Sequence, residues 1–209
     1  MTKILFQGDS ITDCQRNRTD PAGLGQGYPL MIAGQIGYRQ PGQFEFVNRA
    51  ISGNRIVDLY ARWKADCWNL KPDVISILIG VNDVWHELTH ENGVDAKRFY
   101  NIYDLLLTET RERLPHCKII LLEPFLLRGP ATEQNDFTLF SQEVKSRSEA
   151  TYCLAQKHGA SLVLLQDSFS KLARQAPENH WLFDGVHPTA AGHAVIAEKW
   201  LKTWNQEII

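Results

Sequence analysis

Runs of apolar residues recur along the chain with the length and spacing of buried strands. They lie at residues 3–7, 44–47, 74–79, 118–122 and 161–165. Stretches with helical periodicity separate them, and this alternation is typical of β-α-β units built around a parallel sheet. The pattern predicts one α/β domain over residues 1–209, a flavodoxin-like three-layer α/β/α sandwich with about five parallel strands.

Two of the helical stretches are well marked. Between residues 95 and 113 apolar side chains recur at helical spacing, and Asp95 suits the N-cap of that helix. A second helix, from about Thr189 to Trp204, carries apolar residues near one face. We expect its tryptophans to make contacts in the core or in a homo-oligomer.

Small and polar residues follow three of the predicted strands. A Gly-Asp-Ser tripeptide ends at Ser10, an Ile-Ser-Gly-Asn stretch contains Gly53, and a Gly-Val-Asn-Asp stretch contains Asn82. Near the other end of the chain, Asp184 precedes His187 in an Asp-x-x-His motif. In open parallel sheets, ligands bind outside the carboxyl ends of the strands, so these residues are candidates for one site.

Ser10, His187 and Asp184 together supply the groups of a serine hydrolase. A serine hydroxyl is a weak nucleophile until a neighbouring base removes its proton, and the base needs an orienting carboxylate. Acyl transfer also needs donors for the oxygen that becomes negative, which the backbone of Gly53 and the amide of Asn82 could supply. Each residue has a simpler explanation alone, as a helix cap or a turn. Four such pieces at strand ends and a final loop favour catalysis.

These four blocks resemble those of the SGNH or GDSL hydrolases, over about the whole chain. The resemblance implies the SGNH hydrolase fold, with Ser10 as nucleophile, His187 as base and Asp184 as the residue that orients His187. It also implies an oxyanion hole made by the N–H groups of Ser10 and Gly53 and by the amide of Asn82.

A narrower resemblance concerns the residues around these blocks. Ile11 stands where the GDSL name has leucine, and both are apolar. The stretches 8–13, 48–54 and 79–85 are similar to intracellular acetyl xylan esterases, which deacetylate xylo-oligosaccharides. The resemblance implies hydrolysis of short-chain esters of carbohydrates, chiefly acetyl esters such as acetylated xylo-oligosaccharides, through an acyl-Ser10 intermediate and without a metal or other cofactor.

Candidate substrate contacts lie beside the catalytic blocks. Asp9, Trp85 and Trp181 are assigned to substrate binding, although packing in the core is an alternative for both tryptophans. Three long loops are expected to form the walls of the site, at residues 12–27, 123–136 and 173–188.

Composition limits the partners of this protein. A net charge of −2 and the absence of a basic run give no electrostatic case for nucleic acid. No apolar stretch approaches the roughly 20 residues needed to cross a bilayer. The N-terminus lacks a signal-peptide pattern, and the four cysteines lack CxxC spacing, so we expect reduced thiols and a cytoplasmic protein.

Other functions remain open from the residues alone. His86 and His90 flank an HExxH motif with Glu87, which on a helix could bind Zn²⁺, but no familiar third-ligand motif follows. A lysophospholipase or thioesterase would need a long apolar channel, which no segment locates. A catalytically silent glycan-binding module on the same fold is the alternative outside enzymology, and an intact set of catalytic residues argues against it.

Overall fold

Five parallel strands form one sheet in the order β2-β1-β3-β4-β5. The computed structural model describes residues 1–134 and 136–207. The strands are β1 (Thr2–Gly8), β2 (Phe44–Asn48), β3 (Val74–Leu78), β4 (Lys118–Leu122) and β5 (Ser161–Val163). All five coincide with predicted apolar runs, and their order is that of the flavodoxin-like doubly wound sheet. The predicted fold class is confirmed.

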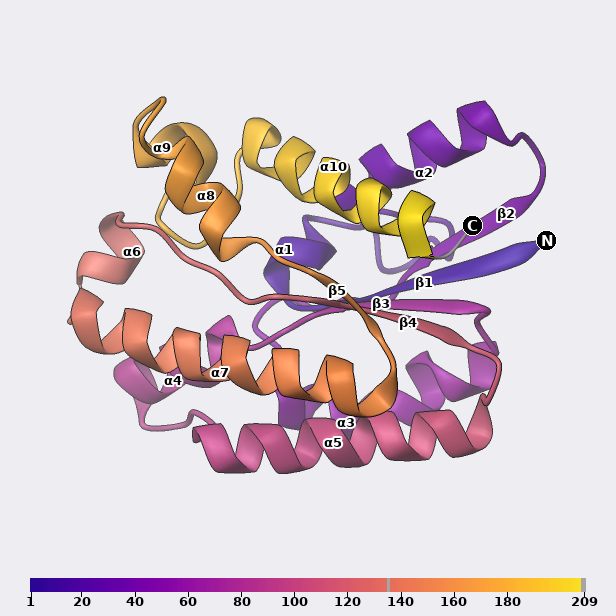
Figure 1. Ribbon diagram of the computed structural model, residues 1–209, viewed down its shortest axis with the longest axis horizontal. Helices are drawn as coiled ribbons and strands as arrows, with labels where there is room; N and C mark the ends of the chain where they lie inside the picture. Colours follow the sequence, from indigo (N-terminus) through magenta and orange to yellow (C-terminus); the bar gives the residue numbers. More distant parts are fainter. Residues whose placement is uncertain (135, 208–209) are drawn as a thin grey trace.

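Helices cover both faces of the sheet (Figure 1). On one side lie α1 (Ser10–Asp13), α2 (Tyr28–Arg39), α8 (Gln166–Leu172), α9 (Glu178–Trp181) and α10 (Ala190–Glu207). The other side carries α3 (Ile56–Asp66), α4 (Val81–His90), α5 (Ala96–Arg113) and α7 (Phe137–His158). Two short pieces complete the chain, a 3₁₀ turn η1 (Trp68–Leu70) and the helix α6 (Pro130–Glu133).

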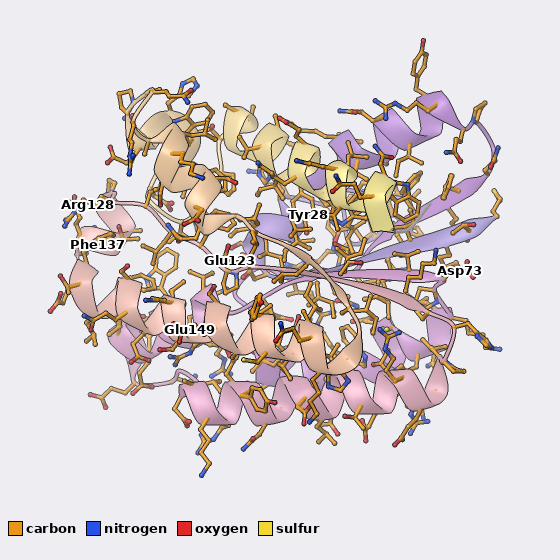
Figure 2. All side chains as sticks on the ribbon, in the orientation of Figure 1. Tyr28, Asp73, Glu123, Arg128, Phe137 and Glu149 are labelled. Carbon is orange, nitrogen blue, oxygen red and sulfur yellow. The ribbon has the colours of Figure 1, made fainter. Side chains whose placement is uncertain are left out.

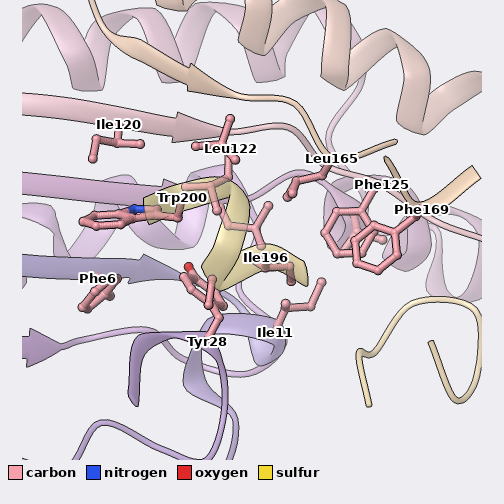
Figure 3. Close-up of a cluster of buried hydrophobic side chains, with 14 of the residues drawn as sticks. Phe6, Ile11, Tyr28, Ile120, Leu122, Phe125, Leu165, Phe169, Ile196 and Trp200 are labelled. Atoms are coloured by element: carbon pink, nitrogen blue, oxygen red, sulfur yellow. The ribbon is translucent and has the colours of Figure 1, made fainter. Parts of the chain in front are cut away.

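Alternate strand residues divide between two apolar cores. Phe6 and Ile120 belong to the core beneath α2 and α10, whereas Leu5 and Ile119 belong to the core beneath α3 and α5. This division follows from the pleat, because successive side chains of a strand point to opposite faces. Figure 3 shows the first core, where Trp200 of α10 lies over the sheet. Both faces being covered explains why the strands are continuous apolar runs.

The two marked helices begin and pack as predicted. The Asp95 carboxylate accepts a hydrogen bond from the N–H of Arg98 at 2.9 Å, so Asp95 is the N-cap of α5. Trp200 and Trp204 stack with ring centroids 5.3 Å apart, and both are buried. The Trp200 indole N–H donates to Ser76 Oγ at 3.0 Å. The tryptophans of α10 are therefore core contacts.

The carboxyl ends of the strands lie together at one edge of the sheet. In Figure 2, Asp73 before β3 and Glu123 after β4 mark opposite ends of the strands. Glu123 Oε2 accepts hydrogen bonds from the N–H groups of Leu165 at 2.7 Å and Gln166 at 2.9 Å. Because Glu123 binds these backbone N–H groups, they do not pair with β4. β5 therefore ends at Val163, two residues before the end of the apolar run 161–165.

The three long loops surround this carboxyl edge and contain short helices. The loops are residues 12–27, 123–136 and 173–188; position 135 lies outside the described residues. The Arg128 guanidinium lies 4.2 Å from the centroid of the Phe137 ring and ties the second loop to α7 (Figure 2). No helix in residues 1–134 and 136–207 is long and apolar enough to cross a membrane.

Candidate active site

A chain of two hydrogen bonds joins Ser10, His187 and Asp184. Ser10 Oγ lies 2.9 Å from His187 Nε2, and His187 Nδ1 lies 2.7 Å from Asp184 Oδ2. Because an ionised carboxylate only accepts, Nδ1 carries the proton and donates it to Asp184. This tautomer leaves the lone pair of Nε2 facing the Ser10 hydroxyl. The three side chains have the geometry of a nucleophile, a base and an orienting acid.

Ser10 stands at the point where β1 turns into α1. A Cβ at Gly8 would lie 2.3 Å from the carbonyl oxygen of Leu78 in β3, so only glycine fits there. The Asp9 carboxylate then accepts a hydrogen bond from the N–H of Ile11 at 3.0 Å and caps α1. Strand, tight turn and cap together place Ser10 at the first position of the helix, with its side chain at the sheet edge.

A compact turn fixes Asp184 against His187. Asp184 Oδ1 accepts hydrogen bonds from the N–H groups of Val186 at 2.9 Å and His187 at 2.7 Å. The other carboxylate oxygen is therefore the one left for the imidazole. Since the turn holds both residues, the base and its partner need little reorganisation during a reaction.

Mutual attraction sets the protonation of this pair. Burial alone would raise the pKa of Asp184, but hydrogen bonds from His187 and from the backbone bring that pKa below its ordinary value. Burial would lower the pKa of His187, but Asp184 outweighs burial and raises it. The pair therefore favours an ionised carboxylate, and the imidazole readily accepts a proton.

Gly53 and Asn82 line a hollow that Ser10 and His187 also line. Gly53 lies in the loop after β2, which is held close by a hydrogen bond from the Ile51 N–H to the Gly8 carbonyl at 3.1 Å. Gly53 adopts a φ of +83°, a left-handed conformation that glycine tolerates best. Asn82 lies in the first turn of α4, and its amide donates one hydrogen to the Asn54 carbonyl at 3.2 Å. Within residues 1–134 and 136–207 its second amide hydrogen has no partner.

A buried carboxyl group ties the two donor segments together. Asp83 accepts hydrogen bonds from the N–H of Ile56 at 3.0 and 3.3 Å. This contact joins the start of α4 to the start of α3. Burial raises the pKa of Asp83 to about 7, and it raises the pKa of Asp9 to the same value. The sequence pattern gave no reason to assign Asp83 this connecting position.

The three predicted substrate contacts lie in different surroundings. The Trp85 ring lies 5.8 Å from the His187 ring and lines the hollow with Gly53 and Asn82. Trp85 and Trp181 both pack against the core beneath α2 and α10, and the Trp181 indole N–H donates to the Leu172 carbonyl at 3.1 Å. Asp9 is only 1% exposed. Asp9 caps α1 from inside and Trp181 is hydrogen-bonded to the end of α8, so neither lines the hollow, and their assignment to substrate binding stays a prediction.

An aromatic residue that the sequence analysis did not single out covers the base. Phe183 stacks on His187 with ring centroids 5.6 Å apart and an interplanar angle of 16°. Its side chain is 57% exposed, so the ring is available to a ligand as well as to the imidazole. Its position directly before Asp184 was the available signal in the sequence.

The HExxH histidines lie on one face of α4, beside the same hollow. The rings of His86 and His90 are 6.2 Å apart and line it with Ser10 and Asn82. Glu87 is occupied elsewhere, because its carboxylate accepts a hydrogen bond from the Gly93 N–H at 2.9 Å. Within the described residues there is no group of three His, Cys, Asp or Glu side chains placed to hold a metal ion. The motif is helical, as a zinc site would require, but lacks a third ligand in this part of the chain.

The hollow beside Ser10 thus brings a hydrogen-bonded serine close to Gly53 and Asn82, whose N–H groups are of the kind that can stabilise a developing negative charge. Such an arrangement can transfer an acyl group to the serine and then to water. A larger hollow of about 740 Å³ lies elsewhere, between α7 and the segment around β5. Its lining contains none of the three hydrogen-bonded residues. The hydrogen-bonded residues and this larger hollow are therefore separate features of the part of the chain that the structure describes.

Comparison with known proteins places this chain among esterases. A sequence model of the GDSL-like Lipase/Acylhydrolase family matches residues 6–195. An acetylxylan esterase from Geobacillus stearothermophilus is 35% identical over 210 residues, which cover 96% of this chain and 92% of that protein.

Solved structures give the same picture. A GDSL-like protein from Parabacteroides merdae ATCC 43184 superposes with a TM-score of 0.93 at 37% identity, covering 98% of this chain and 95% of that one. The acetylxylan esterase Axe2 from Geobacillus stearothermophilus gives a TM-score of 0.88 at 32% identity, with 99% and 95% covered.

Proposed function

Because this chain belongs to the GDSL-like lipase/acylhydrolase family and is a carboxylic ester hydrolase, we propose that it deacylates carbohydrates carrying short acyl groups. The preferred substrate is an acetylated oligosaccharide, such as an acetylated xylo-oligosaccharide. The reaction passes through an acyl-Ser10 intermediate and uses no metal ion.

The proposed reaction proceeds in two steps. His187 Nε2 takes the hydroxyl proton of Ser10 as Oγ attacks the ester carbonyl carbon. The N–H groups of Ser10 and Gly53 and the amide of Asn82 stabilise the oxyanion. The alcohol leaves with the proton from His187. Water, deprotonated by the same imidazole, then attacks acyl-Ser10 and releases the acid.

One observation carries the proposal. The Ser10 hydroxyl lies 2.9 Å from an imidazole that Asp184 orients, in a hollow lined also by Gly53 and Asn82. Relatives support the assignment, since structures of Axe2 variants described as catalytic mutants replace a serine, an aspartate and a histidine with alanine. In that enzyme the aspartate lies three residues before the histidine, as Asp184 and His187 do here.

The lining of the site favours a short acyl group. The hollow beside the oxyanion donors has a volume of about 330 Å³. Its exposed lining is mostly carbon, but Trp85 is the one apolar residue among side chains that carry polar groups, such as Ser52, His86, Thr89 and His90. A long acyl chain gains about 0.8 kcal/mol for each methylene that it buries, and no aliphatic side chain among the described lining residues is there to cover it. An acetyl group has no methylene to bury, so an acetyl ester loses little binding free energy in such a hollow.

Acyl-chain length provides the test of this function. With p-nitrophenyl esters from acetyl to decanoyl, kcat/KM should fall as the chain lengthens, because the additional methylenes remain in water or meet polar groups. Acetylated xylo-oligosaccharides should be hydrolysed with release of acetate. The measurements are initial rates for the ester series and acetate release for the oligosaccharides.

The alternative enzyme classes give the opposite trend. If kcat/KM rises steadily from acetyl to decanoyl, the carbohydrate function is wrong and a lysophospholipase or thioesterase function replaces it. If the protein binds xylo-oligosaccharides but hydrolyses no ester, it is a silent glycan-binding module.

Removal of the Asn82 amide should impair the chemical step. Loss of one oxyanion donor costs about 10²–10³ in kcat, or about 3–4 kcal/mol. We expect Asn82→Ala to lower kcat by this amount and to change KM much less, because the lost bond forms mainly in the transition state. Steady-state kinetics on p-nitrophenyl acetate measures both constants. Asn101→Ala, an exposed site on α5, is the matched control. A change in KM alone would place Asn82 in ground-state binding instead.

A further inference from the structure

A second hollow opens on another side of Ser10 and has a different chemical character. Its volume is about 530 Å³, and its wall includes both Ser10 and His187. The remaining wall comes largely from the loop after α1, including Gln15, Arg16 and Arg18. The oxyanion donors Gly53 and Asn82 line the other hollow. A substrate bound at Ser10 can therefore extend into either of two hollows. The second hollow is the one lined by arginine side chains.

Arg16 is held rigidly at this wall. Its backbone N–H donates to Asp13 Oδ1 at 3.1 Å, and its Nε donates to the Ala50 carbonyl at 2.7 Å. The two residues before it, Cys14 and Gln15, adopt φ values of +38° and +60°, which turn the chain sharply. A side chain already fixed in this way loses little conformational entropy when it binds a ligand.

The end of the Arg16 guanidinium is available. Within residues 1–134 and 136–207, its two terminal nitrogens have no hydrogen-bond partner. Neither terminal nitrogen is buried, so both are open to solvent. A guanidinium presents a planar pair of N–H groups, and this geometry matches a carboxylate or a phosphate.

The surroundings of Arg16 carry an excess of positive charge. Asp13 is the one acidic residue of this wall, and it is already engaged by Arg18 at 2.7 Å and by the Ser52 N–H at 3.0 Å. Burial lowers the pKa of the Arg16 guanidinium. The charge of Asp13 opposes that shift, and three neighbouring guanidinium groups add to it: Arg18, Arg49 and Arg62. In a protein with a net charge of −2, this wall is a local cationic site.

The wall also contains two histidines, His187 and His193, and neither adds a negative charge to it. The Tyr28 N–H donates to His193 Nδ1 at 3.2 Å, so the other ring nitrogen carries the proton and faces Cys14 Sγ at 3.4 Å. Burial lowers the pKa of His193 to about 4, which keeps the ring neutral. His187 is neutral or positive.

We propose that this second hollow is an anion subsite, in which Arg16, assisted by Arg18, binds a carboxylate on the alcohol part of the ester. The preferred substrates are then acetylated oligosaccharides that carry a uronate close to the acetylated sugar. The inference rests on the proposed function for its sugar component, whereas the recognition of an anion beside the ester does not depend on a sugar.

Matched pairs of acidic and neutral esters test the subsite. The first pair is an acetylated xylo-oligosaccharide bearing a uronate and the same compound with that carboxyl reduced to an alcohol. The second pair is 4-acetoxybenzoate and 4-acetoxybenzamide. For each enzyme the ratio of kcat/KM for the acidic over the neutral member is measured, at low and at high salt. Comparing this ratio between variants cancels differences in intrinsic reactivity and any general loss of activity.

The wild-type ratio for the oligosaccharide pair should exceed one and fall as salt is added, because ions screen an exposed charge pair. Arg16→Gln should lower the ratio of both pairs by about tenfold, as expected for the loss of a charge-assisted hydrogen bond. Arg18→Gln should lower it less, because Arg18 is already paired with Asp13. Arg98→Gln, a 66% exposed arginine on α5, should leave both ratios and the rate on p-nitrophenyl acetate unchanged.

Two results would overturn the subsite. One is an oligosaccharide ratio near one in the wild type, and the other is a ratio that Arg16→Gln does not change. If neither oligosaccharide is hydrolysed while p-nitrophenyl acetate is, the proposed carbohydrate function fails. The benzoate pair then decides the subsite alone, since a ratio that Arg16→Gln lowers supports it and an unchanged ratio excludes it. Melting curves of each variant identify loss of fold.

Discussion

Ser10→Ala should remove esterase activity, with kcat lowered by about 10⁴ or more. The reason is that Ser10 Oγ is the atom that forms the proposed acyl intermediate, and no other group can substitute for it once the hydroxyl is gone. The same variant should no longer be labelled by a fluorophosphonate, which reacts with an activated serine. Intact-mass spectrometry before and after the reagent measures the label directly, and p-nitrophenyl acetate hydrolysis measures the activity.

Ser52→Ala is the matched control for this experiment. Ser52 lines both hollows beside Ser10, but its hydroxyl has no basic partner among the described residues. This variant should still take up one fluorophosphonate per chain. Equal labelling of Ser10→Ala and the wild type would show that another serine is the nucleophile.

Asp184→Asn should cost about 10⁴ in kcat while leaving the fold intact. The asparagine oxygen can still accept the hydrogen bonds from the N–H groups of Val186 and His187, so the turn is preserved. Its amide, however, would face His187 Nδ1 as a donor and would favour the tautomer with the proton on Nε2. With its proton on Nε2, the imidazole has no lone pair on the atom that faces Ser10, so it cannot take the proton of the Ser10 hydroxyl.

The pH dependence of the same variant gives an independent readout. Asp184 raises the pKa of His187, and the base works only when it is neutral, so wild-type kcat/KM should fall as the pH drops through that raised pKa. Without the carboxylate the pKa of His187 falls, and the acidic limb of the residual activity should move to lower pH. Asp167→Asn, at an exposed position on α8, should change neither kcat nor the acidic limb of the pH profile. If the acidic limb of the pH profile of Asp184→Asn lies at the same pH as in the wild type, Asp184 does not act through His187.

The strands were predictable because of where they lie. A strand covered on both faces must be apolar at nearly every position, so its sequence shows a continuous run that stands out from the helices around it. The run that contains β5 was read two residues too long. Leu165 remains fully buried after leaving the ladder, because Glu123 takes over its backbone N–H. Leu164, in contrast, is 55% exposed, so an apolar run alone fixes neither burial nor the residue at which the ladder ends.

Contacts between distant segments decided which aromatic residues face the site. Trp85 and Trp181 had equal standing in the sequence, each next to a catalytic block. Both rings pack against the core, but the structure places Trp85 beside His187, whereas the Trp181 indole N–H donates to the Leu172 carbonyl. Phe183, two positions later, takes the exposed place over the imidazole.

By itself, the sequence predicted the fold class and the five residues Ser10, Gly53, Asn82, Asp184 and His187, which the structure brings together. Parallel strands bring all their carboxyl ends to one edge, so the residues that follow them converge there whatever the loops do. Only the tertiary structure decided what the loops contribute. Asp9 is buried behind Ser10, and Arg16 is fixed by the carbonyl of Ala50, a residue from another loop. These positions depend on hydrogen bonds between segments far apart in the chain, and no local pattern encodes them.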